Sequence, residues 1–459
     1  MKKILSILVL AALTLPSCIK VDLDDSVTHN GGGGDNGNFA SLEEKISATK
    51  IITGQIGEHV TLPKGKYTLK GYVYVSNRAT LTFAPGSVIV SDTINKGALI
   101  VERNAKLIAA GTASEPIVFT SGKAPGQRKP GDWGGIILLG NAPTNRATEP
   151  TIEGGVNAQY GGTISGDNSG TLTYVRIEFA GIAADPGSEI NGLTLGGVGS
   201  GTKLENIQVS FGNDDAYEFF GGTVNAKNLV AFATADDDFD FDFGYAGNIQ
   251  FAISCRKPDF FDPGDDTNGI ECDNDGSGSA ATPFTRPVLS NFTIIGHNVP
   301  HTASGRKARS NRWRRASQFV LRNSILMGSQ DAGIQLETAA TAQAYKDGLT
   351  LFKNNLVHAI NNPYAVAGGA EIVLTAAEFQ AKAESEGNIT YTDLAGIKLK
   401  SPLYSTTPDF LPQAGSPALT GVDFTGLGSF FTPVTYRGAF GESNWTTGWT
   451  NWDPQNTVY

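Results

Sequence analysis

Short stretches in which apolar and polar residues alternate recur along most of the chain. Val73–Gly86 matches Leu99–Gly111 position by position, apart from one residue near the end. Further on, similar stretches begin with an asparagine, and the first spacings between them are 22 and 20 residues, followed by 43. These asparagines are Asn206, Asn228, Asn248, Asn291 and Asn355. A period near 20 residues with short strands predicts a solenoid.

The type of solenoid follows from the residues in the repeat. Gly, Val, Thr and Asn are frequent in it and a 3.6-residue periodicity is missing, which excludes helical repeats. The fixed leucine spacing of leucine-rich repeats is also missing. We therefore predict an all-β fold, a right-handed parallel β-helix, with the asparagines stacked at a turn in left-handed geometry.

Three features depart from the repeat near the end of the chain. Thr375–Glu378 has the form of a capping box, and Gly387 can end the helix that it predicts. Leu411–Leu419 is typical of the end of a β-helix domain. We expect Trp445, Trp449 and Trp452 to form a C-terminal cap over the last open coil.

One stretch of the predicted β-helix is strongly acidic. Residues 213–275 contain fifteen Asp and Glu against three Lys and Arg. From Asp238 to Phe243, Asp and Phe alternate, which places the three Phe inside the solenoid and the three Asp outside. A shift of 22 residues superimposes Asp214, Asp215 and Glu218 on Asp236, Asp237 and Asp240, and Gly269–Asp275 fits as a third coil.

Stacked coils lie about 4.8 Å apart, so Glu218, Asp240 and Glu271 should form a column of carboxylates. Such a column requires a cation, shared protons or basic groups above it. Ca²⁺ is the cation that suits these ligands, because it takes six to eight oxygens in flexible geometry. The predicted metal-ligating residues are Asp214, Asp215, Glu218, Asp236, Asp237, Asp240, Asp242, Glu271, Asp273 and Asp275.

A dense basic segment at residues 306–315 offers two alternatives to a metal site. Its side chains could pair with the acidic column. They could instead bind an anionic polysaccharide through Arg309, Arg312 and Arg314, with Trp313 stacking on a sugar ring. A fully solvated acidic face remains the third possibility for the column.

The whole chain has 459 residues and a net charge of −10, which argues against nucleic acid as a partner. Lys2 and Lys3 precede an apolar run, Ile4–Leu13, that has the length of a signal peptide. Leu15–Cys18 resembles the lipobox of bacterial lipoproteins, which implies a leader at 1–17 and lipidation of Cys18. A Gly-rich tether is expected over 18–46 and the β-helix domain over 47–459.

The sorting signals also resemble those of exported lipoproteins. Ile19 is not the aspartate that retains a lipoprotein in the inner membrane, and Asp22, Asp24 and Asp25 look like a surface-export signal. The resemblance implies a lipid-anchored protein of the outer membrane that faces the exterior. An oxidising location allows a disulfide between Cys255 and Cys272. The apolar alternation before Cys255 favours the alternative of two buried thiols.

Longer motifs resemble one family. Trp133–Pro143, Glu189–Gly199, Phe220–Asn225 and Val434–Phe440 are similar to segments of a family of Bacteroidota surface lipoproteins. The resemblance covers most of residues 50–445. It implies a pectate-lyase-like β-helix without an established activity.

Two functions are compatible with these patterns. The favoured one is a non-catalytic surface module that binds a glycan or a protein partner and is stabilised by Ca²⁺. The alternative is a polysaccharide lyase or glycoside hydrolase that uses the acidic column on an acidic polysaccharide. Gly212–Asp215 faintly resembles the paired aspartates of polygalacturonases, but the other motifs of those enzymes are absent. We therefore predict no catalytic residue.

Overall fold

The computed structural model describes residues 39–185 and 188–459. Cys18, the leader and most of the predicted tether lie outside these residues. The compact unit begins at Ala40, and its first element, α1 (Leu42–Thr49), packs on the first strands. The folded unit therefore begins before residue 47, the boundary expected from the sequence. Within the described part of the chain, no helix is long and apolar enough to cross a membrane.

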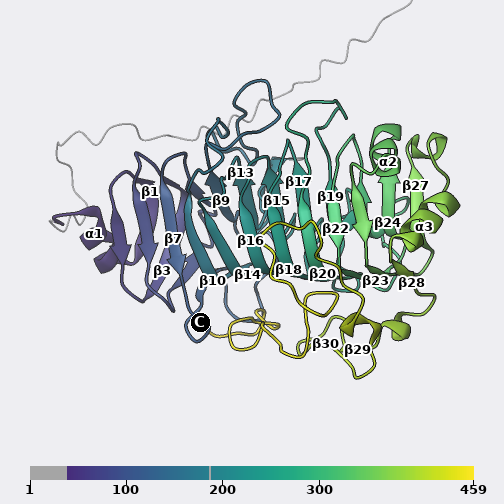
Figure 1. Ribbon diagram of the computed structural model, residues 1–459. Helices are drawn as coiled ribbons and strands as arrows, with labels where there is room; N and C mark the ends of the chain where they lie inside the picture. Colours follow the sequence, from purple (N-terminus) through teal and green to yellow (C-terminus); the bar gives the residue numbers. More distant parts are fainter. Residues whose placement is uncertain (1–38, 186–187) are drawn as a thin grey trace, which may run out of the picture. The chain divides into compact units, whose positions relative to one another are not determined.

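The predicted parallel β-helix is confirmed. Parallel strands stack coil upon coil from α1 to the C-terminal helices and enclose one apolar core (Figure 1). Val73 pairs with Leu99 and Leu81 pairs with Leu107, so the two matching segments form successive coils in register. The strands form three faces.

The first face, called the groove face below, begins with β1 (Ile51–Ile56) and the second half of β3 (Lys66–Val75). It continues through β6 (Leu99–Val101), β9 (Ile136–Leu139), β13 (Leu193–Gly196), β15 (Tyr217–Phe220), β17 (Phe239–Asp242), β19 (Thr267–Cys272), β21 (Ala308–Trp313), β24 (Ala332–Glu337) and β27 (Asn362–Ala367).

Long bent strands supply parts of the other two faces. These are β10 (Gly170–Glu178), β14 (Lys203–Ser210), β16 (Asn225–Phe232), β18 (Asn248–Cys255) and β20 (Val288–Ile295). Before and after them, separate strands form the second face: β2 (Val60–Leu62), β4 (Thr80–Phe83), β7 (Lys106–Ala110), β22 (Val320–Arg322) and β25 (Leu351–Lys353). The third face has β5 (Val88–Ser91), β8 (Ile117–Thr120), β23 (Ile325–Ser329), β26 (Leu356–Ala359) and β28 (Ile389–Thr390).

The asparagines of the repeat occupy two kinds of position. Asn206, Asn228 and Asn291 lie at the bend inside a long strand and have φ of 56°, 57° and 60°, as their left-handed preference predicts. Asn248 and Asn355 instead donate hydrogen bonds from Nδ2 to an asparagine of an adjacent coil, at 2.7 and 2.9 Å. The asparagines therefore do not form the single stack that was predicted, but fill two separate structural roles.

Helices cover the C-terminal end of the core. The predicted capping box is present at Thr375 and Glu378 and begins α3 (Ala376–Ser385). Phe379 of α3 packs edge to face on Tyr364 of β27 and on Tyr345 of α2 (Ala339–Lys346). These two helices, and not the tryptophans, therefore cover the last coil.

The prediction that Trp445, Trp449 and Trp452 cap the last coil is wrong. The C-terminal segment, residues 391–459, includes β29 (Leu399–Ser401) and β30 (Asp409–Pro412) and runs back along the outside of the solenoid (Figure 1). Trp449 packs on Tyr174 of β10, and Trp452 packs on Phe232 of β16. These aromatic side chains cover apolar residues on the outer surface of the third face.

Both cysteines of the domain are buried and free. Cys272 lies in the core of the solenoid, whereas Cys255 lies in the outer cluster beneath the C-terminal segment. The burial predicted from the apolar alternation is confirmed.

Candidate functional site

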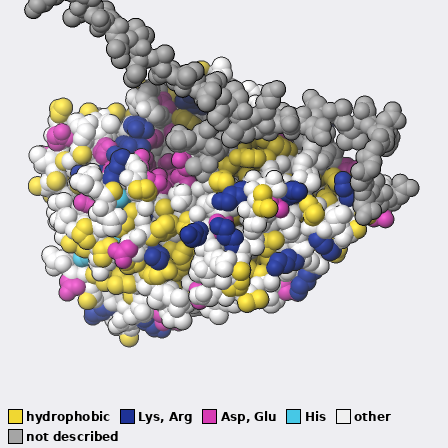
Figure 2. Space-filling view, turned by 180° about the vertical axis from the view of Figure 1, so that it is seen from behind, with side chains coloured by type: hydrophobic (Ala, Val, Ile, Leu, Met, Phe, Trp, Pro, Cys, Tyr) yellow, Lys and Arg dark blue, Asp and Glu magenta, His cyan; other side chains and the backbone are white. Residues whose placement is uncertain are grey.

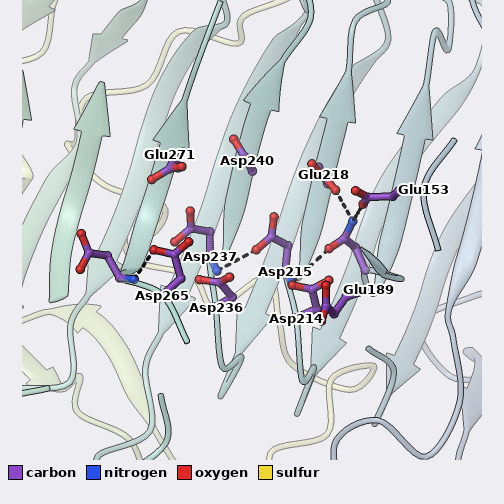
Figure 3. Close-up of a pocket in the computed structure, with 12 residues that line it drawn as sticks. Glu153, Glu189, Asp214, Asp215, Glu218, Asp236, Asp237, Asp240, Asp265 and Glu271 are labelled. Atoms are coloured by element: carbon purple, nitrogen blue, oxygen red, sulfur yellow. Dashed lines mark hydrogen bonds between the residues drawn. The ribbon is translucent and has the colours of Figure 1, made fainter. Parts of the chain in front are cut away.

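The predicted column of carboxylates is present on the groove face. Glu218 of β15 pairs in register with Asp240 of β17, and Asp240 pairs with Glu271 of β19. Their side chains follow one another across three coils (Figure 3). The alternation that placed Phe239 and Phe241 inside therefore also placed Asp240 outside.

A second row of carboxylates lies beside this column, at the turns that precede β15 and β17. It contains Asp214, Asp215, Asp236 and Asp237 (Figure 3). Backbone amides hold this row, because the N–H of Asp237 donates to Asp215 Oδ1 at 2.8 Å and the N–H of Asn268 donates to Asp237 Oδ1 at 2.6 Å. The 22-residue period thus brings both rows together.

The two rows line an open groove of about 170 Å³, called the acidic groove below. Seven of the ten predicted metal-ligating residues line it. The sequence reasoning missed five others, which are Glu153, Glu189, Asn191, Asp265 and Asp266. Apart from Asn191, every residue that lines the groove among those described is acidic. On the face shown in Figure 2, acidic side chains gather at the upper left, directly beside basic ones.

Asn191 connects both rows to a loop. Its Nδ2 donates to Glu153 Oε1 at 3.0 Å and to Glu218 Oε2, and its Oδ1 accepts from the N–H of Asp215 at 3.2 Å. Glu153 belongs to the loop at residues 140–169, whose Tyr160 packs on Phe220 outside the solenoid. This loop lies outside the repeat, so no periodic signal could place Glu153. Asn191, by contrast, lies in a motif noted in the sequence.

Three predicted metal-ligating residues do not line the groove. Asp273 is held by Arg314 Nε at 2.9 Å and by Arg315 at 2.7 Å. Asp275 accepts hydrogen bonds from the backbone and hydroxyl of Ser277 at 2.8 and 2.7 Å. Asp242 lies two residues after Asp240, at the end of β17. These three predicted ligands therefore do not belong to the groove.

The basic segment pairs with one end of the acidic column, as one of the alternatives predicted. Arg312 contacts Glu271 at 3.1 Å, and Arg314 also pairs with Glu271. Arg309, which is 4% exposed, pairs with Asp266 at 2.9 Å. At the other end of the column, Glu218 forms no salt bridge with a basic side chain among the described residues.

The predicted role of Trp313 in stacking on a sugar is wrong. Trp313 is fully buried in the core, where its ring stacks on Phe319 at a centroid distance of 4.0 Å. Arg312 on one side of it and Arg314 on the other point outward, so the alternation of the strand directs Trp313 inward.

The predicted alternation also fails at both ends of β17. Asp238 is fully buried and pairs with Arg256 at 2.7 Å, instead of facing the solvent. Phe243 has φ of 49° and packs on Phe220 outside the solenoid. Because β17 has only four residues, its pleat fixes the side-chain direction from Phe239 to Asp242 and no further.

The carboxylates of the acidic groove destabilise one another's charged forms. Burial raises the pKa of Asp215 well above its usual range, and the charges of Asp214 and Asp236 raise it further. Burial also raises the pKa of Asp240, together with the charges of Glu271 and Asp237. At Glu271, burial raises the pKa while Arg314 and Arg312 lower it. The groove carboxylates without an arginine partner, such as Asp215, are therefore stabilised by protonation or by a bound cation.

These observations define a parallel β-helix with an open acidic groove on one face, lined by carboxylates that are buried or partly buried. The family model described as pectate-lyase-like beta helix domain matches residues 54–450, and the chain therefore belongs to that family. A search of curated proteins found no match. Among solved structures, the chain is similar to the crystal structure of pectate lyase Pel9A, with 13% identity and a TM-score of 0.35. That alignment covers 87% of this chain and 90% of the other.

Proposed function

We propose that this protein is a non-catalytic binding module of the cell surface that holds Ca²⁺ in the acidic groove and binds an extracellular glycan or protein. One observation carries the proposal. Asp215 and Glu218 are each 7% exposed, yet their nearest charged neighbours in the groove are other carboxylates. Buried charges of one sign require a compensating charge.

The donor atoms favour Ca²⁺ over a transition metal. The lining of the groove offers carboxylate oxygens and the amide of Asn191, and no His or Cys among the described lining residues. Ca²⁺ binds six to eight oxygens in irregular geometry, whereas transition metals prefer imidazole or thiolate. The open groove also leaves room for a ligand oxygen beside the ion.

The protonation state of Arg312 and Arg314 supports a binding function in preference to a catalytic one. A lyase needs a group that accepts a proton from its substrate. Burial lowers the pKa of Arg312 and Arg314, but the charges and hydrogen bonds of the surrounding carboxylates, Glu271 foremost, together outweigh it and hold both values above the usual one. The nearest guanidinium groups thus keep their protons. His297 contacts the carbonyl of Phe260 at 3.1 Å and stacks on Phe261, which is a structural role.

Calcium should stabilise the purified protein. At a concentration one hundred times the dissociation constant, one bound ion contributes about 2.7 kcal/mol, which corresponds to a rise in Tm of about 3 °C for a domain of this size. The measurement is the melting temperature with Ca²⁺ and with EDTA. A variant with Asp215→Asn and Asp240→Asn should lose the rise, while Asp242→Asn, which changes a neighbour outside the groove lining, should keep it. Equal melting temperatures of the parent with Ca²⁺ and EDTA would overturn the proposal.

The lipid anchor at Cys18 and the outward-facing position in the outer membrane belong to the same proposal, supported by the leader-like N-terminus. Cys18→Ser should move the protein from the membrane fraction to the soluble fraction, because it removes the acylated thiol. Fractionation followed by immunoblotting measures this change. A variant that remains in the membrane fraction would contradict the anchor.

A further inference from the structure

The carboxylates of the acidic groove form three overlapping groups. In each group, one oxygen from each of three residues lies within 4.8 Å of the others. The first group is Asp214, Asp215 and Asp236; the second is Asp215, Glu218 and Asp240; the third is Asp237, Asp240 and Glu271. Ca²⁺ binds oxygens at about 2.3–2.6 Å, so ligands on opposite sides of one ion are about 5 Å apart. Each group therefore has the size of one cation site.

The third group differs from the other two because the protein supplies its cation. Glu271 contacts Arg312 at 3.1 Å and also pairs with Arg314. The first and second groups have no ion pair with a basic side chain among the described residues, and they share Asp215. The row of coils thus has guanidinium groups at one end and two neighbouring uncompensated positions at the other.

An unpartnered atom points to a ligand independently of the clustering. Asp240 Oδ1 is buried and has no hydrogen-bond partner among the described residues. Asp240 is shared by the second and third groups, and its side chain lies between those of Glu218 and Glu271 (Figure 3). A buried carboxylate oxygen without a partner destabilises the fold, and coordination of a cation removes this destabilisation.

The number of charges exceeds what one ion can balance. The first two groups together contain five carboxylates, which are Asp214, Asp215, Asp236, Glu218 and Asp240. One divalent cation offsets two of these charges and leaves three without compensation in the groove. We propose that the acidic groove binds two divalent cations of the Ca²⁺ class, one in each of the first two groups, with the carboxylate of Asp215 bridging them. This inference rests on the proposed function and extends it.

The test is the number of Ca²⁺ ions that the purified protein binds, measured by equilibrium dialysis at pH 8 with CaCl₂ as the probe. Two ions per chain are expected. Asp214→Asn and Glu218→Gln each change a residue of one group and should each leave one ion. Asp215→Asn changes the shared residue and should lower the affinity for both Ca²⁺ ions at least tenfold. Asp242→Asn, outside all three groups, should still bind two.

The outcomes separate this inference from the proposed function. One ion per chain in the parent, or loss of only one ion in Asp215→Asn, would overturn the bridged pair and leave a calcium-binding module. No bound calcium in the parent would overturn both. Far-UV circular dichroism reports whether each variant is folded, and Asp236→Asn replaces Asp214→Asn as the variant of the first group if the latter unfolds.

Discussion

An Arg256→Ala variant should be less stable than the parent by about 3–5 kcal/mol, because it leaves a buried charge without its partner. Arg256 is 2% exposed, and its Nε lies 2.7 Å from Oδ2 of the fully buried Asp238. Its guanidinium also donates to the carbonyls of Thr234, Asp236 and Asn268. One side chain thus ties the turn that carries Asp236 and Asp237 to β19 of the next coil.

Chemical denaturation, read as the shift of the midpoint at constant slope, measures this loss. Arg306→Ala is the matched control, because Arg306 and its partner Asp265 are 40% and 63% exposed and lie 3.4 Å apart. Such an exposed pair contributes about 0–1 kcal/mol. If Arg256→Ala were no more destabilising than Arg306→Ala, the buried pair would not have the structural role assigned to it.

In EDTA, the protein should become more stable as the pH falls from 8 to about 5. Burial and neighbouring charges raise the pKa values of Asp215, Glu218 and Asp240 well above their usual range, so the folded state binds protons more readily than the unfolded state. Proton binding by these groups contributes its full stabilisation below the usual carboxyl pKa of about 4. This contribution is lost as the pH rises through their raised pKa values in the folded state. Each neighbouring pair of charges about 5 Å apart costs about 3 kcal/mol before salt screening.

The melting temperature between pH 4.5 and pH 8 measures this dependence. Saturating Ca²⁺ should make the melting temperature less dependent on pH, because the ion then offsets the charges that protons offset in EDTA. A variant with Asp215→Asn and Asp240→Asn should show a flatter curve even in EDTA. Below pH 4 the trend should reverse, since ion pairs and hydrogen bonds lower the pKa of Asp266 and Glu337. A melting temperature that rises from pH 5 to pH 8 in EDTA would contradict the prediction.

The sequence was sufficient to predict the repeat and the acidic column. Both depend on periodicity, because residues one coil apart in a β-helix are neighbours in space. The pairing of Glu218, Asp240 and Glu271 follows from the period and the alternation alone. The inward direction of Trp313 could have been predicted as well, since it lies between Arg312 of the same strand and Arg314 directly after it, which both face outward.

The parts of the site that were missed come from segments without a period. The loop that carries Glu153 is placed by the packing of Tyr160 on Phe220, which the spacing of residues does not encode. The same holds for the tryptophans of the C-terminal segment, which pack on β10 and β16 and not on the last coil. Local patterns define contacts between adjacent coils, but not where an irregular segment returns to the solenoid.

The returning C-terminal segment has a consequence for how the molecule holds together. In most solenoids each repeat touches only its neighbours, so the end coils can fray one at a time. Here the hydroxyl of Tyr459 donates to Glu178 of β10 at 2.5 Å, while Arg437 of the same segment donates to the carbonyl of Asn354, which precedes β26, at 2.7 Å. The C-terminal segment thereby joins coils that are far apart in the stack. Unfolding of the coils between β10 and β26 therefore requires this segment to detach as well, which couples the unfolding of these coils.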